Sequence, residues 1–304
     1  MSVIYDSVLT NAYQNIAFER QLSELTTDEV TLFLWQNDNC VVIGRNQNPL
    51  AECNLKYLQE NDITLSRRYS GGGAVFHDLG NVNYTLVMKE KDYSLEKAKY
   101  FLLKAFEFLK LDVEFSGRND LTINGYKFSG QAYYSHNQMY VLHGTLMYDL
   151  DIATLGKCLT PSKAKLQSKG IKSVKSRVMN LKKINPELTI KQIKEALVKA
   201  FEFVYDKADG IKIVDRESID SNLYEYIQSE DWLFCQSPKY NVELDKKFPF
   251  GNITLQLEIK RNKVANAKIF TDSLHTSWET LEKNLVNIPY DEKVIWTTIK
   301  EYMM

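Results

Sequence analysis

Apolar positions recur at helical spacing in several parts of the chain and predict helices there. After Thr10, a side chain suited to cap a helix, Tyr13, Ile16 and Ala17 recur at this spacing and predict a first helix over residues 11–24. The same period predicts further helices at 55–61, 95–109 and 190–204. The apolar stripes of the two longest of these are expected to face a core.

Runs of β-branched and aromatic residues predict strands between these helices. VTLFLW (30–35) and CVVIG (40–44) flank the polar residues 36–39 and predict a hairpin. The strand-like segment 112–134 is interrupted by Asn124-Gly125, a dipeptide favoured in two-residue primed turns. Further strands are predicted at 82–88 and 139–148. Because strands and helices do not alternate regularly, the pattern favours α+β architecture.

The sequence changes character beyond Gln236. SPKYNVELDKKFPFG (237–251) contains two prolines and several polar residues, and a new hairpin is predicted in NITLQLEIKRNKVANAKIF (252–270), followed by helix-like segments. We therefore predict two domains, 1–244 and 245–304. The second is small enough to depend on the first for stability.

Composition narrows the class of protein. The chain has 304 residues, of which 44% are apolar and 25% are charged, and its net charge is −1, so no bias towards nucleic acid is present. Four widely spaced cysteines without a Cys-x-x-Cys pair favour reduced thiols over a disulfide framework or a zinc site. The N-terminus lacks the pattern of a signal peptide, and no segment has the length of a membrane span. We expect a cytoplasmic protein with no membrane partner.

The stretch Ser66–Leu86 is the strongest candidate for a functional site. Its glycine triplet, Gly71 to Gly73, lacks Cβ atoms, so a ligand can lie against the peptide N–H groups. The adjacent Arg67 and Arg68 carry fork-shaped donors that suit phosphate or carboxylate, which suggests an anionic ligand. A bulged hairpin with surface arginines is the commoner explanation of such a triplet taken alone.

The whole string RRYSGGGAVFHDLGN (67–81) is more specific, and it resembles the signature of the lipoate–protein ligase A family, in the group that includes biotin ligases and octanoyltransferases. VVIGRNQNP (41–49), KFSGQA (127–132), KSVKSRVMNL (172–181) and PFGNITLQLEIKRNKVANAKIFTDSL (249–274) also match that family. The resemblance implies a mixed β-sheet catalytic domain of the biotin/lipoate ligase type, flanked by helices, and a small α+β C-terminal domain. It departs from the family at the end, where the tail after Leu274 is shorter than expected.

The resemblance also implies a reaction. ATP and Mg²⁺ would serve to activate lipoate as lipoyl-AMP with release of pyrophosphate, and the lipoyl group would then pass to a lysine of a lipoyl-domain protein. The implied acceptors are the glycine cleavage H protein and the E2 subunits of 2-oxoacid dehydrogenases. No P-loop is present, so phosphate binding of that kind is not expected. A monomer is expected, and the sequence does not separate lipoate from octanoate.

The candidate catalytic residues follow from the same resemblance. Lys127 would offset negative charge on the carboxylate and the α-phosphate, Asp120 would orient Lys127 or the incoming amine, and Asn119 would contact phosphate or Mg²⁺. Mg²⁺ would be held mainly by the nucleotide, with Asn119 or Asp120 as its protein ligand. Without the family context, a surface lysine and a polar turn explain these residues equally simply.

The resemblance assigns further residues to three sets. The expected lipoate and adenylate contacts, besides Asn119 and Lys127, are Arg68, Ser70, Gly71, Gly72, Gly73, Ala74, Val75, His77, Asn81, Gly130, Gln131, His143, Gly144 and Thr145. The expected walls of an acyl tunnel are Trp35, Val42 and Gly44. The expected adenylate-binding loop contains Lys169, Ser173, Val174, Arg177 and Val178. Both histidines can instead be hydrogen-bonded core residues, and neither is needed as a general base.

Three alternatives stay open at this point. The run 156–183 holds eight lysines, one arginine and no acidic residue, and it is equally explained as a solvated basic loop, although it could steer an acidic partner. A related acyltransferase would work through a cysteine thioester, for which Cys158 is the candidate nucleophile. A non-catalytic module that binds lipoyl domains or nucleotides is the third alternative.

Overall fold

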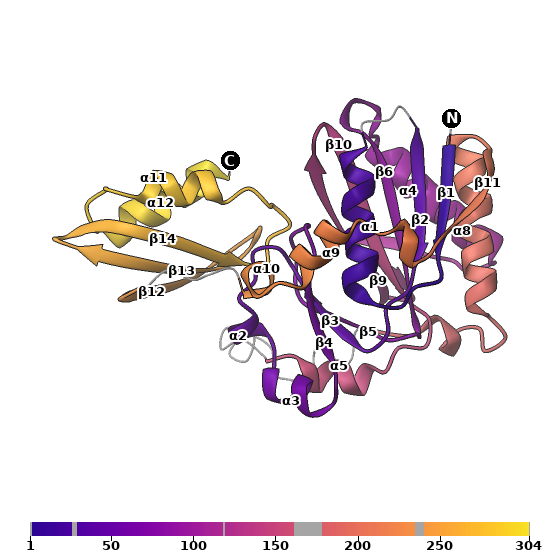
Figure 1. The fold of residues 1–304 in the computed structure, drawn as a ribbon, viewed down its shortest axis with the longest axis horizontal. Coiled ribbons are helices and arrows are strands. Elements are labelled where there is room, and N and C mark those ends of the chain that lie inside the picture. The colour runs from indigo at the N-terminus through magenta and orange to yellow at the C-terminus, as the bar shows by residue number, and fades with distance from the viewer. Residues whose placement is uncertain (1, 26–28, 118, 161–177, 235–239, 304) are drawn as a thin grey trace.

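The computed structural model describes residues 2–25, 29–117, 119–160, 178–234 and 240–303. The chain forms two lobes, and the smaller one holds the C-terminal strands and helices (Figure 1). The larger lobe is built on an eight-stranded sheet with the order β11-β1-β2-β6-β10-β9-β8-β7. Strand β1 runs parallel to β11 and β2, and the other neighbours are antiparallel, so the sheet is mixed.

The strands predicted at 30–35, 82–88, 112–134 and 139–148 are present in this sheet, whereas its strands at Ser2–Ser7 and Ala208–Val214 were not predicted. The sheet consists of β1 (Ser2–Ser7), β2 (Val30–Trp35), β6 (Asn81–Lys89), β7 (Glu114–Ser116), β8 (Asp120–Ile123), β9 (Tyr126–His136), β10 (Met139–Met147) and β11 (Ala208–Val214). The predicted hairpin turn at Asn124-Gly125 is confirmed, since both residues have positive φ, 51° and 77°, between β8 and β9.

The hairpin predicted from residues 30–35 and 40–44 is wrong. Strand β2 is flanked on both sides by β1 and β6, whereas β3 (Cys40–Ile43) belongs to a separate three-stranded sheet, between β4 (Thr64–Arg67) and β5 (Val75–His77). The polar connection is held by the first helix and not by a turn: the Asn15 side chain donates to the Asn37 side-chain oxygen at 3.0 Å, and the Asp38 amide donates to the Thr10 carbonyl. The loop therefore carries the chain out of the large sheet.

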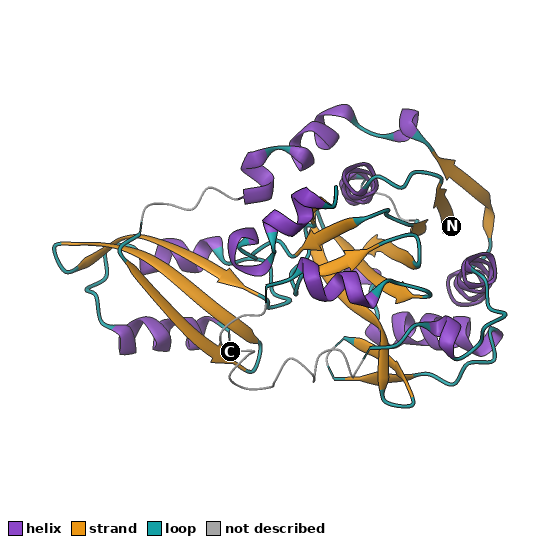
Figure 2. Cartoon of the chain, turned by 90° about the horizontal axis from the view of Figure 1, so that it is seen from below, coloured by secondary structure: helices purple, strands orange, loops and turns teal. Residues whose placement is uncertain are grey.

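Helices cover both faces of the large sheet (Figures 1 and 2). Helix α1 (Ala12–Glu24) lies on one face, and α4 (Leu95–Phe108) packs with α8 (Ile190–Tyr205) on the other. All three agree with the helical periods in the sequence. The N-cap of α1 is Asn11 and not Thr10, because the Asn11 side chain accepts hydrogen bonds from the amides of Tyr13 and Gln14.

Shorter helices complete the larger lobe. They are α2 (Pro49–Glu52), α3 (Leu55–Glu60), α5 (Ile152–Cys158), α9 (Ser221–Gln228) and α10 (Glu230–Phe234). Short 3₁₀ turns occur at Glu90–Asp92, Leu181–Lys183 and Arg216–Ser218. None of the helices in the described part of the chain combines the length and the apolar character that crossing a membrane requires.

The smaller lobe has its own core. Strands β12 (Val242–Phe248), β13 (Gly251–Lys260) and β14 (Lys263–Thr271) form a sheet on which α11 (Glu279–Leu285) and α12 (Glu292–Tyr302) pack. The hairpin predicted in 252–270 is confirmed as β13 and β14. The expected boundary between residues 244 and 245 falls inside β12, so we propose that the accessory domain begins no later than Val242.

Candidate active site

The register of four neighbouring strands brings candidate residues together on the sheet face that α1 covers. Trp35 on β2 lies opposite Asn83 on β6, which lies opposite Thr145 on β10. The hydroxyl of Thr145 accepts the amide of Gly130 on β9 at 3.3 Å. A row of polar groups therefore crosses the sheet from the predicted acyl tunnel towards Lys127.

Lys127 and Asp120 form an ion pair at the far end of this row. The Lys127 Nζ atom lies 2.7 Å from the Asp120 Oδ1 atom, and both side chains are partly exposed. A Cβ atom added to Gly130 would lie 3.1 Å from Lys127 Nζ, so the lysine head packs directly over this glycine. An ordinary surface lysine does not explain this arrangement fully, because the ammonium group of Lys127 has a defined place beside a carboxylate.

The end of the predicted adenylate-binding loop lies beside the same lysine. Val178 forms a parallel bridge with Lys127, and the Met179 amide donates to the Lys127 carbonyl at 2.9 Å. The other predicted loop residues, Lys169, Ser173, Val174 and Arg177, lie outside the described residues. The described end of this segment is nevertheless held against the strand that carries Lys127.

Both arginines of the central motif are buried and donate to the protein itself. Arg67 donates to the carbonyls of Gly44, Arg45, Gln47 and Leu233. Arg68 donates to the Ser70 hydroxyl and to the carbonyls of Val42, Gly71 and Gly73. The sequence suggested that these forks face an anion, but in this structure they shape the loop backbone instead. Burial lowers the pKa of Arg68 to about 10, so it stays charged at neutral pH.

The glycine triplet is packed backbone against backbone. Gly72 has a φ of +91°, which favours glycine, and a Cβ atom on Gly44 would lie 2.2 Å from the Gly72 carbonyl oxygen. The Gly72 amide donates to the Ser273 carbonyl of the smaller lobe at 2.8 Å. A Cβ atom on Gly71 would lie 2.3 Å from that same oxygen. Gly44, Gly71 and Gly72 are thus required for packing inside the protein, whereas a Cβ atom on Gly73 would meet nothing within 4 Å.

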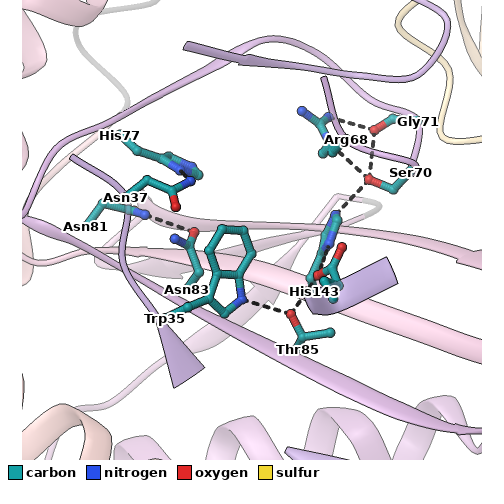
Figure 3. Close-up of polar contacts among 11 residues, drawn as sticks. Trp35, Asn37, Arg68, Ser70, Gly71, His77, Asn81, Asn83, Thr85 and His143 are labelled. Carbon is teal, nitrogen blue, oxygen red and sulfur yellow. Dashed lines mark hydrogen bonds and ion pairs between the residues drawn. The ribbon is translucent and has the colours of Figure 1, made fainter. Parts of the chain in front are cut away.

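The two strand histidines are buried and hydrogen-bonded, as the core alternative predicted. His77 contacts the Asn37 amide group at 3.2 Å, and burial, reinforced by Arg68 and His143, lowers its pKa to about 3. His143 lies 2.7 Å from the Ser70 hydroxyl (Figure 3). On its other side, the Glu19 carboxylate is also 2.7 Å away. His77 is therefore neutral at physiological pH.

Sequence reasoning missed Glu19, which is buried in α1. The helical spacing contained a signal for it. Glu19 lies three residues after Ile16 and three residues before Leu22, so it falls on the buried stripe of the helix. A carboxylate on such a stripe requires partners, and Glu19 has them in Thr85 and His143, each at 2.7 Å. Its position indicates that the carboxylate takes part in a hydrogen-bond network inside the core.

Several buried polar atoms near the row have no hydrogen-bond partner among the described residues. They are His77 Nε2, Asn81 Oδ1, Asn83 Nδ2 and Gln131 Nε2. An unpaired buried polar group is costly, so such groups at one place fit a polar ligand that would satisfy them. Asn81 and Asn83 hydrogen-bond each other at 3.0 Å beside Trp35 (Figure 3).

The remaining predicted residues lie in the same region with differing roles. Trp35 and Val42 are buried in the apolar cluster under α1, and Trp35 donates to the Thr85 hydroxyl at 3.0 Å. Ala74 and Val75 are half-buried, and Gly144 lies against the Tyr84 ring. Asn119 donates through its side chain to the Gln131 carbonyl at 2.5 Å, so it fixes the strand beside Asp120.

The chain matches two protein families. The lipoyl protein ligase A/B catalytic domain matches residues 11–202, and the bacterial lipoate protein ligase C-terminus matches residues 237–304. The lipoate-protein ligase A of Psychrobacter cryohalolentis is 36% identical over 301 residues, which cover 95% of this chain and 89% of that protein. The chain therefore belongs to the lipoyl protein ligase A/B family of enzymes.

Solved structures share this fold. LipL1 of P. falciparum, in complex with lipoate, is 28% identical and has a TM-score of 0.84, covering 99% of this chain and 94% of its own. A bipartite lipoate protein ligase, studied with its E2 lipoyl domain, from Thermoplasma acidophilum is 23% identical with a TM-score of 0.68, covering 79% and 98%. The second likeness concerns the fold alone.

Proposed function

We propose that this protein is an ATP-dependent lipoate–protein ligase that forms lipoyl-AMP and then transfers the lipoyl group to a lysine of a lipoyl-domain protein. The observation that carries the proposal is the Lys127–Asp120 ion pair, 2.7 Å long, at the end of a buried polar row with unpartnered atoms. Family membership and the lipoate complex of LipL1 support it. The cation, the row of polar groups and the apolar residues beside it together suit a fatty acid that is activated at its carboxylate.

In the first step, a carboxylate oxygen of lipoate attacks the α-phosphorus of ATP, and pyrophosphate leaves with the electron pair of the broken P–O bond. Lys127 would lie where negative charge builds up on the attacking carboxylate and on phosphorus. A fixed ammonium lowers the barrier more in a partly dry site than in water. Trp35 and Val42 would form part of the wall of a tunnel for the apolar acyl chain.

In the second step, the ε-amine of the acceptor lysine attacks the acyl carbon, AMP leaves, and the amine loses a proton to form the amide. Asp120 would hold Lys127 in place or orient the incoming amine. The acceptors that we propose are the glycine cleavage H protein and the E2 subunits of 2-oxoacid dehydrogenases. The basic run at 156–183 would favour an acidic partner.

Mg²⁺ would be held mainly by the nucleotide phosphates. Among the described residues, no group of three or more His, Cys, Asp or Glu side chains could hold a metal ion. Asn119 and Asp120 carry the side-chain oxygens that we propose as its protein ligands, since Mg²⁺ commonly takes one or two protein carboxylates beside phosphate oxygens. When bound, the ion would neutralise charge on the leaving pyrophosphate.

The environment of Cys158 favours the ligase over the thioester-forming transferase. The thiol is fully buried in an apolar cluster with Val41, Cys53 and Phe76. Burial, together with the nearby Asp151 carboxylate, raises the pKa of the thiol to about 11. A transferase needs the opposite, an accessible thiol with a lowered pKa.

The proposal is tested by lipoate-dependent exchange of pyrophosphate into ATP, without an acceptor protein. We expect exchange in the wild type and a loss of about 10²–10³-fold in Lys127→Ala, because the variant removes the charge that stabilises the transition state. Lys191→Ala is the matched control, since Lys191 is an exposed lysine on α8 and should keep the wild-type rate.

The alternatives give different results. If the folded wild type binds ATP and lipoate but catalyses no exchange with or without a lipoyl domain, the non-catalytic module is the better description. If acyl groups move between carrier proteins without ATP, the cysteine-dependent transferase is the better description. Full exchange in Lys127→Ala would remove Lys127 from its proposed role.

A further inference from the structure

A chain of hydrogen bonds joins helix α1 to the glycine triplet. Thr85 and His143 both contact one oxygen of the Glu19 carboxylate at 2.7 Å. His143 Nε2 lies 2.7 Å from the Ser70 hydroxyl, which accepts Arg68 Nε at 2.9 Å (Figure 3). Arg68 then donates to the carbonyls of Gly71 and Gly73, at 2.6 and 2.8 Å.

When the His143 imidazole is neutral, the groups at the two ends fix the direction of every bond in this chain. A guanidinium only donates and a carboxylate only accepts. The Ser70 oxygen accepts from Arg68, so its own hydrogen is free to point to His143, the nearer acceptor, and not to the Gly71 carbonyl at 3.5 Å. His143 must then carry its proton on Nδ1, where it donates to Glu19. Only one tautomer of His143 satisfies all of these contacts.

The charges at the two ends also support each other across Ser70 and His143. Arg68 is buried, which disfavours its charged form, while the Glu19 carboxylate favours it. Removing the Glu19 charge would leave a buried cation without this compensation. A residue that served only to anchor α1 would not need to face this charge.

We propose that Glu19 is a positioning residue for the glycine triplet: it fixes the tautomer of His143 and, through Ser70 and Arg68, the carbonyls of Gly71 and Gly73. The peptide groups of the triplet then face the substrate in one orientation. The expected effect of Glu19 on catalysis rests on the proposed ligase function. Its expected effects on the tautomer of His143 and on the position of the glycine triplet hold whether or not the protein is a ligase.

Glu19→Gln is the decisive variant because its side chain has nearly the same shape but can donate as well as accept. The amide can turn its NH₂ group to His143, which would move the imidazole proton to Nε2 and break the bond from Ser70. Glu24→Gln on the exposed side of the same helix is the matched control. The thermal unfolding of both variants is also measured, so that a loss of folded protein can be told apart from a displaced glycine triplet.

The first measurement is the tautomer of His143 by ¹⁵N NMR, with a His143→Gln variant to assign the signal among the four histidines. The wild type and Glu24→Gln should show Nδ1–H with a bare Nε2, and Glu19→Gln should show Nε2–H or a mixture. An Nε2–H tautomer in the wild type would overturn the proposal, without any variant and whether or not the protein is a ligase.

The second measurement is a double-mutant cycle of Glu19→Gln with Ser70→Ala in the exchange assay. We expect Glu19→Gln alone to raise the KM for lipoate and ATP about ten- to hundredfold, the usual range for a lost hydrogen bond to a charged group, with a smaller change in kcat. Because the effect passes through Ser70, it should largely disappear in the Ser70→Ala background. Additive effects, or an unchanged KM, would contradict the proposal. Absence of exchange in the wild type would instead count against the ligase function.

Discussion

The geometry of the site depends on glycines, which have no side chain, as much as on the charged residues. Lys127 has four flexible carbon atoms, yet its head is confined between the Asp120 carboxylate and the bare backbone of Gly130. A long side chain holds one position only when its surroundings remove the other rotamers. The KFSGQA string therefore encodes both the cation and the space that it occupies.

Gly130→Ala tests this confinement. Its Cβ atom would approach Lys127 Nζ to 3.1 Å and Cε to 3.3 Å, so the flexible lysine head must move while the backbone can stay. We expect pyrophosphate exchange to fall by up to about tenfold with little change in thermal stability, because the lysine head must shift slightly and a displacement of about 1 Å can cost a hundredfold in rate. Ser135→Ala, an exposed position on the same strand, is the control. An unchanged exchange rate would show that the position of the head is not limiting.

Individual residues were predictable to different degrees. The resemblance gave Lys127 and Asp120 as a functional pair, and the ion pair between them fits that assignment. It could not reveal that Arg67 and Arg68 turn inward, because carbonyls such as that of Leu233 come from a segment distant in sequence. Glu19 was missed for the same reason, since its importance arises from His143 on another element.

Elements follow local signals more closely than their pairing does. The turn at Asn124-Gly125 and the helices α1, α4 and α8 were predictable because the turn chemistry and the apolar period act within a few residues. The neighbours of β3 in its sheet were not predictable. Each strand has two edges, and the pattern of apolar residues in the sequence does not say which strand pairs with either edge. The contacts of Asn37 and Asp38 with the start of α1 decided the outcome.

Helix α8 offers a test of element stability, because its first turn has a complete capping box. The Thr189 hydroxyl accepts the Gln192 amide, and the Gln192 side chain accepts the Thr189 amide at 2.9 Å. We expect Thr189→Ala to lower the free energy of unfolding by about 1 kcal/mol, measured by urea titration of the larger lobe. Lys191→Ala in the same turn should cost less than about 0.5 kcal/mol. Equal losses in both variants would contradict a specific role of the cap.

At the scale of the molecule, the smaller lobe rests on the candidate site itself. The Thr271 amide donates to the Asn46 carbonyl at 2.8 Å, and the Gly72 amide donates to the Ser273 carbonyl. Arg45 and Glu279 add an ion pair of 2.9 Å, which is partly exposed and hence of small energy. Docking of this lobe therefore depends mainly on contacts at two places in the larger lobe, the glycine triplet and Asn46, whose side chain also donates to the His275 carbonyl at 3.2 Å.

Gly71→Ala should undock the smaller lobe. The added Cβ atom would lie 2.3 Å from the Ser273 carbonyl oxygen and 2.7 Å from that of Leu274, and these are backbone atoms that cannot turn away as a side chain can. We expect the radius of gyration from small-angle X-ray scattering, measured without substrates, to increase, and protease cleavage between the lobes to become faster. Gly73→Ala is a closely matched control, since a Cβ atom there meets nothing within 4 Å. If both variants scatter like the wild type, the contact between the triplet and residues 273–274 does not hold the lobes together, and the ion pair of Arg45 with Glu279 becomes the next candidate to test.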